Sequence, residues 1–188
     1  MNKIVTLILL VISTTYSQNQ VEKFKLSPEG FPDYVVLEFD DKSTSDIFNS
    51  LKKWAEYNLR NADYSNYSEV ENEYLTYTFI DNNAVETGTG LSHFVFSIEY
   101  DVELRIKDNR LRIDVILKEM PMVNPSHGSP LTLTSSANAW PLFKKNGDIR
   151  NRKSASEAIP QIESSANNIV QSFYNAIIGK VDYKKTDW

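Results

Sequence analysis

The sequence predicts a two-layer α+β domain, in which two helices pack on one face of an antiparallel sheet in the order β-α-β-β-β-β-α. Two observations carry this prediction. Residues 90–119 alternate apolar and polar side chains and turn once, at "KDNR", which is typical of a long β-hairpin. Segments with helical spacing of apolar residues stand before and after this hairpin, so two helices are available to cover its apolar face.

The first strand and the first helix follow each other directly. The run "YVVLEF", residues 34–39, is rich in β-branched and aromatic residues and reads as a strand. From residue 45 to about residue 60 the apolar residues recur every three or four positions, which predicts an amphipathic helix. Ser43 and Asp46 resemble a capping box at its start.

The long hairpin is the most informative part of the chain. A turn at Asp108 and Asn109 sets Leu104 opposite Ile113 and Val102 opposite Val115, so both strands bury one common face. The residues predicted to face the helices are Phe94, Phe96, Ile98, Tyr100, Val102, Leu104, Leu111, Ile113, Val115 and Leu117. Those predicted to face solvent are Glu99, Asp101, Glu103, Arg112 and Asp114.

Two shorter strands are expected before the hairpin. Leu75, Tyr77 and Phe79 alternate with threonines, and the pattern ends at Asn82 and Asn83, which tolerate left-handed turns. A second short strand over residues 84–87 is therefore expected to pair back on the first.

The C-terminal helix is predicted over residues 156–178. Its apolar residues follow helical spacing, Gly179 supplies a stop, and Pro160 is expected in its first turn. The predicted domain then spans residues 18–179, with a long loop over 120–153 and a C-terminal tail over 180–188.

The N-terminus predicts export. Residues 1–17 combine Lys3, a short apolar run and small polar residues before a cleavage site after Ser17, as in a secretory signal peptide. We expect a periplasmic or extracellular protein without stable membrane insertion after cleavage. Removing Lys3 changes the formal charge from −5 to −6, which disfavours nucleic acid as a partner. The chain has no cysteine, so core packing alone must hold the fold.

A family resemblance adds to this interpretation. It rests on a leader that ends in "YSQ", the segment "VVLEFDDKSTSDIFNSLKKWAEYNL", the "ETGTG" between strands, and the final hairpin with Arg110 and Arg112. Over about residues 31–119 the chain resembles secreted bacterial domains of unknown function with a TBP-like fold, named after the TATA-binding protein. The resemblance implies a strand order and an export route. It implies no activity and no DNA binding.

The polar face of the hairpin offers one candidate site. Glu99, Asp101 and Glu103 lie about 7 Å apart along one strand. They could bind a cation, but such a row is more often a solvated face, balanced here by diagonal pairs of Glu103 with Arg112 and of Arg105 with Asp114. His93 shares this face and could join Glu99 or Asp101, although an exposed strand histidine usually has no such role.

The long loop over residues 120–153 offers the other candidate site. Loops of this length are uncommon in compact domains unless they act as lids or binding loops, and this one carries several apolar residues. Part of it is expected to pack on the domain, with a short helix near residues 135–143. The loop could flank a groove, with Trp140, Phe143 and His127 as binding residues, or it could merely cover one end of the sheet.

These patterns favour an exported, non-catalytic binding or interaction module for a protein or a small molecule. The alternative is a carrier of a small apolar molecule in a cavity between the curved sheet and the C-terminal helix. An enzyme ranks third, because the chain has only two histidines and neither a cysteine nucleophile nor a metal-binding motif. We therefore expect no catalytic residues, no metal site and no cofactor.

Overall fold

The fold is a five-stranded antiparallel sheet with two helices. The structure, a computed structural model, describes residues 23–58, 67–89, 92–124, 128–134 and 136–181. The predicted signal peptide over residues 1–17 lies outside these ranges. The elements are β1 (Val35–Glu38), α1 (Thr44–Asn58), β2 (Tyr67–Val70), β3 (Tyr74–Thr89), β4 (Ser92–Lys107), β5 (Arg110–Glu119), β6 (Leu131–Thr132), β7 (Trp140–Pro141) and α2 (Lys153–Ile177). The strand order in the main sheet is β1-β5-β4-β3-β2.

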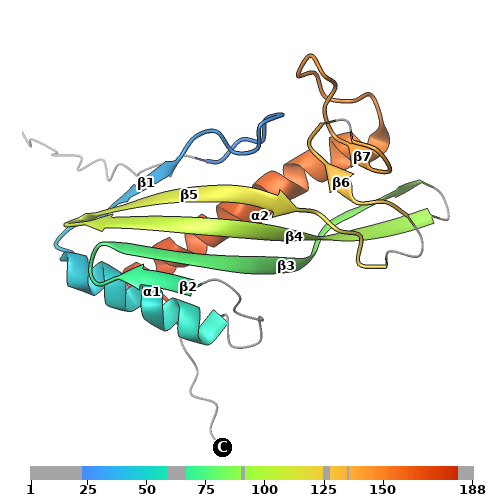
Figure 1. The fold of residues 1–188 in the computed structure, drawn as a ribbon. Coiled ribbons are helices and arrows are strands. Elements are labelled where there is room, and N and C mark those ends of the chain that lie inside the picture. The colour runs from blue at the N-terminus through green and yellow to red at the C-terminus, as the bar shows by residue number, and fades with distance from the viewer. Residues whose placement is uncertain (1–22, 59–66, 90–91, 125–127, 135, 182–188) are drawn as a thin grey trace, which may run out of the picture.

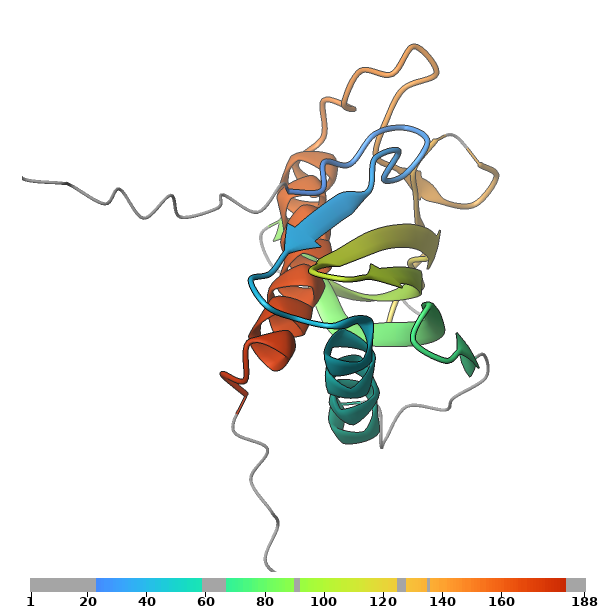
Figure 2. The same ribbon diagram turned by 90° about the vertical axis from the view of Figure 1, so that its left-hand side faces the viewer.

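Both helices cover the apolar face of the sheet (Figures 1 and 2). Trp54 of α1 packs edge-on against Phe173 of α2, with ring centroids 4.6 Å apart, and both rings contact Tyr77 of β3. This aromatic cluster joins the three elements at one point of the core. The predicted fold class is confirmed.

The hairpin of β4 and β5 has the predicted register. Leu104 pairs with Ile113 and Val102 pairs with Val115, while the polar residues between them lie on the open face. The apolar side chains predicted to face the helices are buried, except that Phe94 and Leu117 are only partly so. A bulge between Glu99 and Tyr100 ends the regular pairing.

The prediction for residues 74–87 is wrong in one respect. Asn83 does adopt a positive φ of 59°, but the chain does not turn back there. Instead β3 continues to Thr89 with a register shift between Asp81 and Val85, because β4 is long enough to pair with both halves. The partner on its other side is β2, a strand in a segment that reads as a polar link.

The helix ends differ in how well they match the predictions. The capping box of α1 is confirmed, because the Asp46 N–H donates to Ser43 Oγ and the Ser43 N–H donates to Asp46 Oδ2, at 3.2 and 3.1 Å. The second helix, α2, begins at Lys153, three residues before the predicted start. Pro160 therefore lies inside the helix and not in its first turn. None of the helices in the described ranges has the length and apolarity to cross a membrane.

The long loop packs on the domain as strands. The short helix predicted near residues 135–143 is wrong, since Trp140–Pro141 forms β7, which runs parallel to β6. The Leu131 N–H donates to the carbonyl of Met120 at 3.0 Å, which ties β6 to the chain just after β5. Backbone hydrogen bonds, and not helix formation, therefore fix this segment against the end of the sheet.

Candidate functional site

The open face of the sheet carries a balanced set of charges. The short ion pairs run along the strands and not along the predicted diagonals: Arg112 binds Asp114 two residues along β5, at 2.8 and 2.7 Å, and Arg105 lies 3.5 Å from Glu103 on β4. The reason is the register, which places Glu103 opposite Asp114 and Arg105 opposite Arg112. Like charges face each other across the strands, so each arginine turns to the carboxylate on its own strand. Across one of the two diagonals, the charge of Glu103 does help to raise the pKa of Arg112.

Asp101 is held in its charged form on this face. Partial burial raises the pKa of Asp101, but the Thr78 hydroxyl at 2.6 Å and the Lys118 ammonium at 2.9 Å together lower it below its ordinary value. The guanidinium of Arg112 also stacks on the ring of Tyr34, 3.8 Å from its centroid. Ion pairs thus occupy Asp101 and Glu103, two of the three carboxylates that were candidates for a cation site.

His93 lies apart from those carboxylates. Its Nε2 is 3.3 Å from Oε2 of Glu86 on the neighbouring strand, and both side chains are largely exposed. It does not join Glu99 or Asp101. An open polar hollow of about 500 Å³ surrounds it, lined also by Lys153 and Glu157 of α2. Among the described residues, no group of three or more histidine, aspartate or glutamate side chains is arranged to hold a metal ion.

A largely apolar groove of about 630 Å³ lies where the long loop meets β5. We call it the β5 groove. Its floor is the end of β5 with the two methionines that follow. Its walls are the N-terminal segment at Pro28 and Glu29 and the part of the long loop that begins at Gly128. The lining residues are Pro28, Glu29, Leu117, Lys118, Glu119, Met120, Pro121, Met122, Gly128, Pro130, Leu131, Thr132, Leu133, Thr134 and Ser136. Such a volume is typical of small-ligand sites.

The floor of the groove combines a rigid base with adaptable side chains. Met120, Met122 and Leu131 are nearly fully buried, while Leu133 is only partly so. Methionine side chains are unbranched and polarisable, so they fit apolar ligands of different shapes. Gly128 leaves room for the end of Met122, because a Cβ there would lie 2.6 Å from Cε of Met122.

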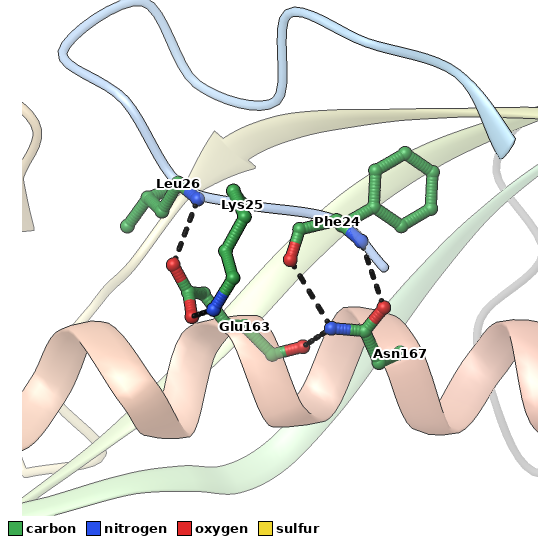
Figure 3. A network of polar contacts seen from close by, with 5 residues as sticks. All are labelled: Phe24, Lys25, Leu26, Glu163 and Asn167. Carbon is green, nitrogen blue, oxygen red and sulfur yellow. Dashed lines mark hydrogen bonds and ion pairs between the residues drawn. The ribbon is translucent and has the colours of Figure 1, made fainter. Parts of the chain in front are cut away.

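The N-terminal wall is fixed by helix α2 (Figure 3). Asn167 binds the backbone N–H and carbonyl of Phe24, and Glu163 accepts from the Leu26 N–H at 3.1 Å and pairs with Lys25 at 2.9 Å. These contacts anchor the segment that leads to Pro28 and Glu29. The groove is therefore built from three stretches of chain that are far apart in the sequence.

The predicted binding residues have different surroundings. Trp140 packs edge-on against Phe94, with ring centroids 4.8 Å apart, and its Cζ2 would lie 3.7 Å from a Cβ at Gly128, behind the groove wall. Phe143 is only 4% exposed and is not among the residues that line the β5 groove, so it is a core residue. His127 lies outside the described residues. A binding role for Trp140 stays a prediction.

Apolar side chains lie between the sheet and α2. Ile98, Ile162 and Phe173 are completely buried there, together with Ala166. The β5 groove is therefore a better-formed ligand site than the region between the sheet and α2. Sequence reasoning named the long loop as a flank but missed Met120, Met122 and the N-terminal wall. The "EMPM" run, with two methionines in a loop, is the signal that could have drawn attention to them.

Comparison with known families matches the central part of the fold. Residues 34–116, from the end of the N-terminal segment to β5, match the family described as "Domain of unknown function (DUF4468) with TBP-like fold". This stretch is similar to DUF4468 domains. The match lies within the residues 31–119 on which the resemblance rests, and it stops just before the groove floor, so the long loop and α2 lie outside it.

Two solved structures share the fold of this chain. One is a TBP-like protein from Parabacteroides distasonis, 17% identical, with a TM-score of 0.50 over 78% of this chain and 91% of that chain. The other is a DUF4468 family protein from Bacteroides ovatus, 10% identical, with a TM-score of 0.53 over 81% of this chain and 88% of that chain. At these identities the similarity establishes the fold alone. No curated protein matches the chain.

Proposed function

We propose that the protein is an exported, non-catalytic binding module whose ligand occupies the β5 groove. The observation that carries this proposal is the groove itself: a pocket of about 630 Å³ with a methionine and leucine floor beside the end of a rigid sheet. Apolar pockets with a few polar groups at the rim are the usual form of binding sites. Export is supported by the signal-peptide pattern of residues 1–17.

A non-catalytic role is supported by the state of the charged groups on the sheet. Lys118 pairs with Asp101 and Arg112 pairs with Asp114, so these groups stabilise each other's charged forms. General acid–base catalysis instead uses groups whose pKa values are shifted toward neutrality, in a cleft that excludes water. Eight of the fifteen residues that line the groove are apolar, and its charged residues are Glu29, Lys118 and Glu119.

The proposal is tested with Nile red, a neutral apolar fluorophore, titrated into the mature protein. We expect saturable fluorescence enhancement in the wild type. Gly128→Leu pushes against the flexible end of Met122, which lines the groove, so the shape of the groove should change and the affinity should fall at least about tenfold. Ser68→Leu is the matched control, because it adds the same side chain to an exposed position on β2, at the opposite edge of the sheet.

Equal thermal stability of the two variants separates blocking of the groove from loss of the fold. Saturable binding that is unchanged in Gly128→Leu would place the site elsewhere. A wild-type protein that gives no saturable enhancement would refute the proposal.

A further inference from the structure

The outer edge of β5 is paired at both ends and open in the middle. On one side β1 pairs with residues 110–113 of β5. On the other side the Met120 carbonyl accepts the Leu131 N–H of β6. In the described part of the sheet, no strand pairs with the outer edge of the stretch between them, residues 114–119. The far end of this open stretch forms the floor of the β5 groove.

The pairing pattern shows which backbone groups face the opening. In an antiparallel ladder, alternate residues direct their N–H and C=O to opposite sides of the strand. The Phe39 N–H donates to Asn109, and the pairing continues through Leu111 and Ile113, so odd-numbered residues of β5 face β1. The same alternation turns the N–H and C=O of Val115 and Leu117 away from β4. Leu117 lines the groove, and its backbone groups are suited to another peptide backbone.

The side chains around the opening define the rest of the ligand. Leu133 and Met122 supply apolar surface, while Glu29 and Glu119 supply negative charge. The one lysine in the lining, Lys118, is paired with Asp101 on the open face of the sheet. The rim of the groove therefore favours a ligand that carries positive charge.

We propose that the β5 groove binds a short extended peptide, which adds a strand to the edge of β5 through Leu117 and bears apolar side chains and at least one lysine or arginine. This inference rests on the proposed function of the groove as a ligand site. The opening between Ile113 and Met120 spans roughly 20 Å, which fits a segment of about five residues. Because β1 and β6 close both ends, a short peptide fits better than the edge of a second copy of the sheet.

The probe is the acetylated and amidated pentapeptide Val-Lys-Val-Lys-Val, measured by displacement of Nile red. Two matched control peptides carry N-methyl groups on backbone nitrogens. One is methylated at the backbone nitrogens of the valines and the other at the backbone nitrogens of the lysines. Only one of these sets of N–H groups can face β5 in an added strand. We therefore expect one methylated peptide to bind about fivefold to tenfold more weakly than the parent, and the other to retain its affinity.

A protein variant provides an independent arm. Leu117→Pro removes a backbone donor that points away from β4, and proline is tolerated at such edge positions. It should weaken the binding of the parent peptide, measured directly by calorimetry because Leu117 also lines the proposed site of Nile red. The peptide controls keep the test valid if this variant fails to fold, because they use the wild-type protein.

Each outcome separates this inference from the proposed function. Nile red binding without displacement by the parent peptide, or equal binding of both methylated peptides and the parent, would overturn strand addition and leave the groove as a small-molecule site. A dimer in sedimentation velocity that dissociates in Leu117→Pro would also overturn it, in favour of a second copy. Absence of Nile red binding would refute the proposed function itself.

Discussion

Asn167 on α2 binds the backbone of Phe24 from both sides: Oδ1 accepts the Phe24 N–H at 2.9 Å, and Nδ2 donates to the Phe24 carbonyl at 3.2 Å (Figure 3). A single side-chain amide thus takes the place of a strand partner for a residue 143 positions away. Phe24 is itself buried, with its ring against Phe31. This contact fixes the chain just before the N-terminal wall of the β5 groove.

Asn167→Ala should destabilise the fold and loosen the groove together. It leaves the N–H and C=O of Phe24 without their side-chain partner in a partly buried site, which costs about 1–3 kcal/mol. The measurements are the free energy of unfolding in urea and the affinity for Nile red, and both should fall.

Glu163→Gln is the matched control for this contact. It keeps an acceptor for the Leu26 N–H but removes the charge pair with the exposed Lys25, so the change in stability should stay below about 1 kcal/mol. If both variants lower the free energy of unfolding by the same amount, Asn167 does not anchor the N-terminal wall.

The stability should depend on the charge of Asp101 at low pH. The folded-state pKa of Asp101 lies below its ordinary value, so its contribution is present above that ordinary value, about pH 4, and is lost as the pH falls through the folded-state pKa. Asp101→Asn should therefore cost more stability near pH 7 than near pH 3, by about 1 kcal/mol or less for a partly exposed pair.

Thr78→Val tests the cause of this dependence. The variant removes the hydroxyl that donates to Asp101 at 2.6 Å, so the pKa of Asp101 should rise and the pH dependence should shrink. Urea unfolding curves at the two pH values give the measurement. A dependence as large as that of the wild type would exclude the Thr78 hydrogen bond as its cause.

Phe143→Ala should act on stability and not as the loss of a surface contact. A buried phenylalanine that is truncated to alanine costs about 3–5 kcal/mol. Ile149, its bridge partner in the same loop, is 50% exposed, so Ile149→Ala should change stability by only about 0.5 kcal/mol. Thermal unfolding gives the measurement. If both variants lose little stability and Phe143→Ala also loses ligand affinity, Phe143 is a binding contact after all.

The spacing of apolar and polar residues in the sequence correctly predicted those parts of the fold that depend on residues close together in the chain. The register of Leu104 with Ile113 follows from a two-residue turn, and the capping box at Ser43 follows from a local spacing. Asn83 shows the limit of such reasoning. Its left-handed backbone was anticipated, but whether such a residue ends a strand or makes a bulge depends on the length of β4, which is set by distant pairing.

The hairpin turn shows a second limit. Asp108 and Asn109 are turn residues by sequence, yet their side chains also bind the backbone between β1 and the start of α1. Asp108 Oδ1 accepts the Thr44 N–H at 3.0 Å, and Asn109 Oδ1 accepts the Lys42 N–H at 2.8 Å. These contacts cross more than sixty positions of sequence. No local pattern signals them, because they depend on how the turn meets the first helix.

The candidate site could be predicted only in part for the same reason. A long loop with apolar residues indicated a groove, but its floor is the end of β5 and its far wall is the segment at Pro28, held by α2. The aromatic residues Trp140 and Phe143 drew attention as the largest side chains of the loop. Their size instead suits them to packing against β4 and the core.

The most direct test of the central claim is native mass spectrometry of the mature protein purified from its own host, with wild type and Gly128→Leu measured side by side. Occupation of the β5 groove predicts a wild-type protein that retains added mass and a Gly128→Leu protein that does not. The same added mass on both proteins, or a wild-type protein with none, would contradict the claim that this groove is where the protein binds its ligand.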